Sequence, residues 1–199
     1  MARDSGNYRT RRMILKDWAT EERVMQLAAG LDLEVVKDSS PDVELGIVRH
    51  VTWRVVEGLI LEYAVDSRSR TSFLAVGGSP AEGVREIERS IEKNLEPWTL
   101  RELLSAVDRV SGVGDLTQAL LRAGVGSPHD FDRRFFKRIK AAFGHPDSRV
   151  RYAGLWATAY SRWSEFRDLI AEMAESDDVD DLRRDARVIL HYYAEGREG

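Results

Sequence analysis

The sequence predicts an α+β protein, with a small antiparallel sheet in its N-terminal half and only helices in its C-terminal half. Between residues 33 and 76, apolar and polar residues alternate, which is the period of half-buried strands. After Pro97, apolar residues recur only at helical spacing. We therefore expect an α/β unit with an antiparallel meander over residues 1–96 and an all-α unit over residues 97–199.

The N-terminal unit is predicted to open with a helix over about residues 14–31, where apolar residues share one face. The arginine-rich stretch before it, residues 9–12, is expected to be frayed. Three successive strands then form a meander, and a further strand near residues 33–36 can precede them. Their alternating apolar positions are Val51, Trp53 and Val55, then Leu59, Leu61, Tyr63 and Val65, then Phe73 and Ala75.

A helix is expected to cover one face of this sheet, because a small sheet with a bare apolar face is not stable alone. Ser79-Pro80-Ala81-Glu82 is typical of a helix start, with serine as N-cap, proline at the first position and glutamate reaching back. The apolar stripe of this helix is Val84, Ile87, Ile91 and Leu95.

Six helices in three antiparallel pairs are predicted for the C-terminal unit, over about residues 100–110, 116–123, 131–143, 149–160, 164–174 and 182–194. The last two pairs are similar to each other in sequence. Phe136, Ile139 and Phe143 recur 30 residues later as Phe166, Leu169 and Met173, and Val150, Arg151 and Gly154 recur 32 residues later as Leu182, Arg183 and Ala186.

The segment His145-Pro146-Asp147-Ser148-Arg149-Val150-Arg151-Tyr152-Ala153-Gly154 resembles the turn and second helix of a HEAT repeat, of the HEAT and armadillo α-solenoid class. The resemblance covers the C-terminal half only. It implies that the second helix of each pair lines a concave surface, and that Arg151 reaches an acidic residue of an adjacent turn, Asp178 or Asp147. The alternative is that Arg151 is a solvated arginine at a helix start. Such repeats serve scaffolds, adaptors, immunity proteins and a few nucleic-acid binders.

Composition excludes several classes of protein. The chain has no cysteine, which excludes disulfides, thiolate-bound metals and thiol catalysis. It has no apolar run near the roughly 20 residues of a membrane span, so we expect a cytoplasmic protein without a membrane partner. A net charge of −4 gives no overall attraction to nucleic acid.

The sequence contains no recognisable catalytic or metal-binding motif, so we expect no enzyme, no cofactor and no metal. The histidines, His50, His129, His145 and His191, show no metal-binding spacing, and phosphate-binding and dinucleotide fingerprints are lacking. A calcium loop that began at Asp177 would need a glycine at its sixth position and a glutamate at its twelfth, and this sequence has neither there. The acidic residues 177–181 are therefore interpreted as carboxylates at the start of a helix, where the helix dipole favours them. An enzyme built around His50, Trp53 and Glu57 stays an open third alternative.

Charge is segregated along the C-terminal unit. Residues 133–151 carry seven basic side chains against one acid, and residues 165–185 carry nine acids against three arginines. This pattern predicts either a polarised binding surface, or pairing between repeats, or solvated faces. The basic helix offers a candidate nucleic-acid site at Arg133, Arg134, Lys137, Arg138 and Lys140.

A stripe of aromatic and basic residues is the candidate binding face. Tryptophan, tyrosine and arginine dominate interface energetics, although clustered aromatics also form cores. The stripe consists of Arg149, Tyr152, Trp156 and Tyr160, continued by Arg183, Arg187 and His191. We therefore expect a non-catalytic module that binds a protein partner, as an adaptor, scaffold or immunity-type protein. The alternative is nucleic-acid binding through the basic helix, as in HEAT-like alkylpurine DNA glycosylases.

Overall fold

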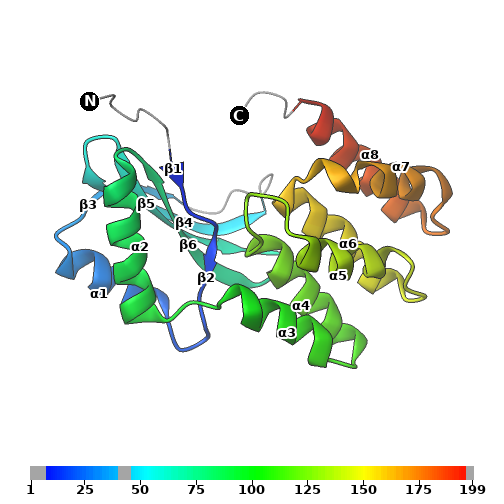
Figure 1. Cartoon of the computed structure of the whole chain (residues 1–199), viewed down its shortest axis with the longest axis horizontal. Coiled ribbons are helices and arrows are strands. Elements are labelled where there is room, and N and C mark those ends of the chain that lie inside the picture. Colours follow the sequence, from blue (N-terminus) through cyan, green and yellow to red (C-terminus); the bar gives the residue numbers. More distant parts are fainter. Residues whose placement is uncertain (1–7, 40–45, 196–199) are drawn as a thin grey trace. The chain divides into compact units, whose positions relative to one another are not determined.

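The structure is a computed structural model that describes residues 8–39 and 46–195. The chain divides into two compact units, Met1–Thr99 and Leu100–Gly199, each described here by itself. The first holds an antiparallel sheet with two helices and the second holds only helices, so the α+β prediction is confirmed (Figure 1).

The sheet has the strand order β1-β6-β5-β4-β3, with β2 also paired to β6. The predicted meander is present as β4 (Ile47–Val56), β5 (Leu59–Asp66) and β6 (Thr71–Gly78). Strand β3 (Glu34–Ser39) pairs with β4 at one edge, and its register shifts between Val35 and Lys37. The predicted fourth strand is therefore confirmed, and it carries a bulge.

The start of the N-terminal unit differs from the prediction. Two short strands, β1 (Tyr8–Arg9) and β2 (Met13–Ile14), pair with β6, and helix α1 is only Glu21–Gly30. Thr10 lies between these strands, where its backbone N–H donates to the carbonyl of Val76 and its side-chain Oγ1 accepts from the backbone N–H of Val76. The prediction of a helix from residue 14 and of frayed arginines is wrong, because the open side of β6 takes this segment as a strand.

Helices α1 and α2 (Ala81–Leu95) bury one face of the sheet. The predicted stripe of α2 is buried, and it packs with the alternating side chains of β4 and β5, as expected. On β6 the prediction is wrong, because Leu74 and Val76 belong to this core and Phe73 and Ala75 do not. All four side chains are buried, so alternation does not identify which face of β6 packs against the helices. The predicted helix start is wrong in detail. Pro80, not Ser79, is the N-cap, and no side chain caps the helix. The backbone N–H of Ser79 instead donates to the carbonyl of Gly58, so Ser79 ends the β5–β6 hairpin.

All six predicted helices of the C-terminal unit are present, and its described residues contain no strand. They are α3 (Leu100–Arg109), α4 (Val113–Val125), α5 (Arg133–Phe143), α6 (Ser148–Ser161), α7 (Arg167–Ser176, after a 3₁₀ turn at Ser164–Phe166) and α8 (Asp180–Glu195). Consecutive helices pack as pairs, α4 packs on α6, and α6 contacts α8. The second helices of successive pairs are therefore neighbours (Figure 1). None of the helices in the described residues is long and apolar enough to span a membrane.

Small residues allow α4 and α6 to approach closely. A Cβ atom added at Gly124 would lie 2.6 Å from Cα of Ala157. On the α5 side, a Cβ atom added at Gly154 would lie 2.7 Å from Cβ of Ala142. Helix α6 thus packs through glycine and alanine on these two sides.

Candidate binding surface

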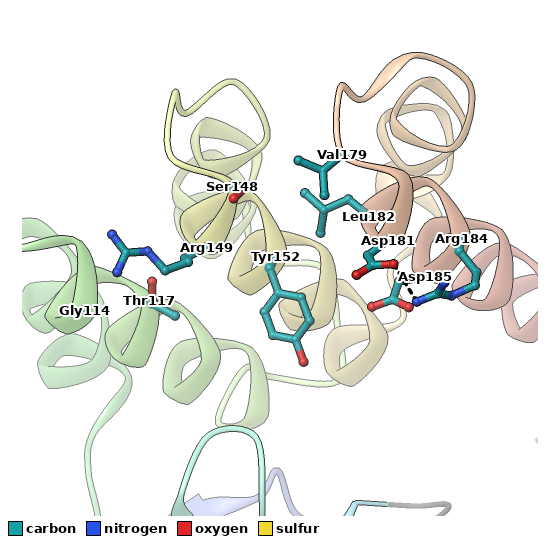
Figure 2. A pocket seen from close by; sticks show the side chains of 10 residues that line it. All are labelled: Gly114, Thr117, Ser148, Arg149, Tyr152, Val179, Asp181, Leu182, Arg184 and Asp185. Atoms are coloured by element: carbon teal, nitrogen blue, oxygen red, sulfur yellow. Dashed lines mark ion pairs between the residues drawn. The ribbon is translucent and has the colours of Figure 1, made fainter.

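A groove of about 470 Å³ lies over the first turns of the second helices α4, α6 and α8 (Figure 2). Its volume is in the range of about 300–1,000 Å³ typical of ligand sites. It is lined by Gly114 and Thr117 of α4, by Ser148, Arg149 and Tyr152 of α6, and by Val179, Asp181, Leu182, Arg184 and Asp185 at the start of α8. We call it the second-helix groove.

The α6 side of the groove is organised by the helix cap. Asp147 is the N-cap, and its carboxylate accepts from the backbone N–H of Arg149 at 2.9 Å. The exposed Arg149 guanidinium also donates to this carboxylate, at 3.0 and 2.7 Å. These hydrogen bonds lower the pKa of Asp147 to about 2. Arg149 is thereby held at the rim, where it lines the groove but already has an ionic partner.

The α8 side is fixed by Arg151, which crosses to the turn before α8. Its guanidinium donates to both carboxylate oxygens of Asp177, at 2.8 and 3.0 Å, and also to Asp178. It further donates to the carbonyls of His145 and Pro146, both at 3.1 Å. The side chains of Arg151 and Asp177 are only 11% and 5% exposed. The predicted link from Arg151 to the next turn is confirmed with Asp178 and extended to Asp177, and the solvated alternative is wrong.

This buried ion pair predicts a pH dependence of stability. Burial opposes the charge of Asp177, but hydrogen bonds from Arg151 and from the Val179 N–H outweigh it and lower the pKa of Asp177. A carboxyl with a lowered folded-state pKa stabilises the fold above its unfolded pKa of about 3.9, and this contribution is lost as the pH falls through the folded value. We expect the free energy of unfolding of the wild type to exceed that of Asp177→Asn at pH 7, and the difference to shrink below about pH 4.

Chemical unfolding of both proteins across the pH range measures this difference. Glu172→Gln, which makes the same change from carboxylate to amide at an exposed acid of α7, is the matched control. A difference between wild type and Asp177→Asn that stays constant down to pH 2.5, well below the usual aspartate pKa of about 3.9, would contradict the assignment.

Charge along the groove is largely compensated. Arg149 pairs with Asp147 at 2.7 Å, and Arg184 pairs with Asp181 at 2.9 Å. Asp185 lines the groove without an ion-pair partner among the residues that the structure describes. In Figure 2, the Tyr152 ring lies between Arg149 on one side and the carboxylates of Asp181 and Asp185 on the other.

The α6 part of the predicted stripe lies on this flank of the helix. Arg149 and Tyr152 line the groove. Trp156 and Tyr160 follow at helical spacing, half-buried and packed against the core of the C-terminal unit. The ring centroids of Tyr152 and Trp156 are 6.2 Å apart. Trp156 is therefore neither a fully buried core residue nor a free anchor, whereas Tyr152 is not part of that core.

The α8 part of the predicted stripe is not brought to the groove. Arg183 instead binds the carbonyl of Asp177 and the carboxylate of Asp180. With 3.6 residues per turn, Arg183 and Arg187 project from one flank of the buried stripe of α8, and Asp181 and Asp185 project from the other. His191 is exposed and is not among the residues that line the groove.

The 32-residue repeat offset in the sequence indicates which residues of α8 correspond to the α6 stripe. Applied to the α6 stripe, it gives one residue of α8 for each residue of α6: Asp181, Arg184, Val188 and Tyr192. The first two line the groove, and Val188 and Tyr192 are large apolar side chains that are 43% and 58% exposed. We call these four residues and the four of α6 the second-helix face.

The basic helix α5 lies outside the groove. Two of its five candidate residues are already paired, Arg134 with Asp132 and Arg138 with Asp108, both at 2.6 Å. Arg133, Lys137 and Lys140 are exposed. Within the described chain, Arg151 is the only residue of the basic segment 133–151 that forms an ion pair with the acidic segment 165–185. The other charges of these two described segments therefore form no ion pair from one segment to the other.

The residues of the third alternative do not converge. Trp53 is buried in the core, and His50, three positions before it on the same strand, projects from the other face of the sheet. His50 Nε2 lies 3.7 Å from Glu62 Oε1, and Glu57 lies in the turn after β4. Over residues 8–39 and 46–195, no group of three histidine or carboxylate side chains is placed to hold a metal ion.

Comparisons of this chain with protein-family models, with curated proteins and with solved structures found no match.

Proposed function

We propose that this chain is a non-catalytic interaction module, of adaptor, scaffold or immunity type, whose three helix pairs are HEAT-like repeats. The protein partner binds the second-helix face. The observation that supports this proposal is the groove, which is lined almost entirely by residues of the second helices. In an α-solenoid, these helices form a continuous surface, because each repeat stacks on the previous one with a small rotation.

The composition of the second-helix face supports a protein partner. It combines tyrosine, tryptophan and arginine, which carry most of the energy at protein interfaces. Val188 and Tyr192 are exposed on the last described helix, where they leave apolar area in contact with water. The acidic side chains of α8 disfavour a phosphate backbone on this face.

Photocrosslinking tests the location of the site. A photoreactive amino acid at position 188 or 192 is expected to crosslink one discrete protein from the native cell extract. The same group at Glu172 of α7, which is exposed on a first helix, is the control and should not crosslink it. Crosslinks to nucleic acid from position 140 of α5 and none from position 188 or 192 would favour the nucleic-acid alternative instead.

The Tyr152→Ala variant then tests the energetics. Tyr152 lines the groove and lies outside the core, so we expect a loss of partner affinity of about 2 kcal/mol, roughly 30-fold, with little change in melting temperature. Calorimetric titration with the crosslinked partner measures the affinity, and Glu172→Ala serves as the control. Unchanged affinity in Tyr152→Ala would remove the groove from the binding site.

A further inference from the structure

The second-helix groove has a charge preference that narrows the kind of partner. Of the four charged side chains that line it, three are compensated: Arg149 by Asp147, and Arg184 and Asp181 by each other. In the described part of the chain, Asp185 alone among them has no ionic partner. The groove therefore presents one uncompensated negative charge to whatever enters it.

The surroundings of Asp185 favour a cation with an apolar stem. Figure 2 shows the Tyr152 ring on the α6 side of the groove, and Val179 and Leu182 on the α8 side with the carboxylates of Asp181 and Asp185. An aromatic face attracts a cation, and apolar walls pack against the methylene groups that lead to it. Arginine satisfies all three features, because its planar guanidinium stacks on a ring and binds a carboxylate through two parallel hydrogen bonds.

Other occupants fit these features less well. A metal ion would find a single free carboxylate and no group of three acidic or histidine ligands among the described residues. A phosphate or an acidic peptide would face Asp185 without a free basic group, because both basic side chains of the groove already hold carboxylates.

We propose that the second-helix groove binds an arginine side chain of a partner polypeptide, with the guanidinium stacked on Tyr152 and paired with the Asp185 carboxylate. This inference rests on the proposed function, because it names the chemistry of the segment that the second-helix face recognises.

Selection from a random 12-residue peptide library on the purified full chain tests the proposal. Peptides that bind should share an arginine, and replacing this arginine by citrulline, its neutral isostere, should weaken binding at least tenfold. In the Asp185→Asn variant, only the Tyr152 ring still favours the cation, so citrulline should weaken binding much less than tenfold. Glu172→Gln removes an exposed carboxylate of α7 outside the groove and should keep the full preference.

The outcomes separate this inference from the proposed function. Peptides that crosslink at position 192 but carry no common arginine, or that bind equally well with citrulline, would overturn the arginine assignment and leave the interaction surface in place. A preference retained in full in Asp185→Asn would also overturn it. A library that yields no peptide crosslinking at position 192 would count against both the arginine assignment and the proposed face.

Discussion

Replacing Arg151 with alanine is expected to lower the free energy of unfolding of the C-terminal unit by about 3 kcal/mol or more. The substitution leaves the carboxylate of Asp177, only 5% exposed, without its cation. It also leaves the carbonyls of His145 and Pro146 without their guanidinium donor. Breaking one side of a buried ion pair costs more than the pair contributes, since the remaining charge stays desolvated.

Arg149→Ala is the matched control, because Arg149 lies two residues earlier on α6 and also pairs with an aspartate. Its guanidinium is exposed, and exposed ion pairs contribute little to stability. Denaturant unfolding of both variants provides the comparison. If Arg151→Ala unfolds at the same denaturant concentration as Arg149→Ala, the link between successive turns is not a structural element of the unit.

Gly124→Leu is expected to prevent α4 and α6 from packing closely. We expect it to lower the free energy of unfolding of the C-terminal unit by at least about 3 kcal/mol, which is the upper end of the usual cost of overpacking a core. The first added atom would already lie 2.6 Å from the backbone of Ala157, which a change of rotamer cannot relieve. Leucine is a good helix former, so loss of helix propensity would not explain the effect.

The control for this variant is Gly114→Ala, at the other end of α4. No heavy atom lies within 4 Å of a Cβ added there, so we expect little change or a small gain from the better helix former. Thermal unfolding, followed by circular dichroism, measures the melting temperatures of both variants. A Gly124→Leu protein that melts like the wild type would show that the contact between α4 and α6 is looser than the structure describes.

The sequence predicts the long elements well and the short ones poorly. The helices of the C-terminal unit and the three meander strands have several periods of apolar residues each, and all of them are present. Strands β1 and β2 are only two residues long, so they have no measurable period. The local pattern alone predicts Ser79 as a cap, but its N–H donates to the carbonyl of Gly58, a contact that depends on the tertiary fold.

Part of the candidate site could likewise be predicted from the sequence, and part could not. The α6 stripe and Arg151 could be identified from the sequence, because they lie within the segment whose repeat pattern is clearest. The residues predicted for the α8 part, Arg183, Arg187 and His191, do not line the groove. They follow from residue type, whereas the repeat offset gives the positions on α8 that correspond to the α6 stripe. Asp185 carries no motif, and its importance depends on which neighbouring carboxylates are already paired, which only the structure shows.

The register shift in β3 bears on solubility. A regular, flat edge strand is a template onto which another chain can add a strand, and repeated addition leads to aggregates. β3 exposes Val35 and Val36, which would favour such addition, but the bulge lies at these residues and Lys37 and Asp38 follow directly. A bulge twists and interrupts the row of backbone donors and acceptors, and adjacent charges oppose a second copy. The sheet can therefore end at β3 with valines exposed to water and still resist edge-to-edge association.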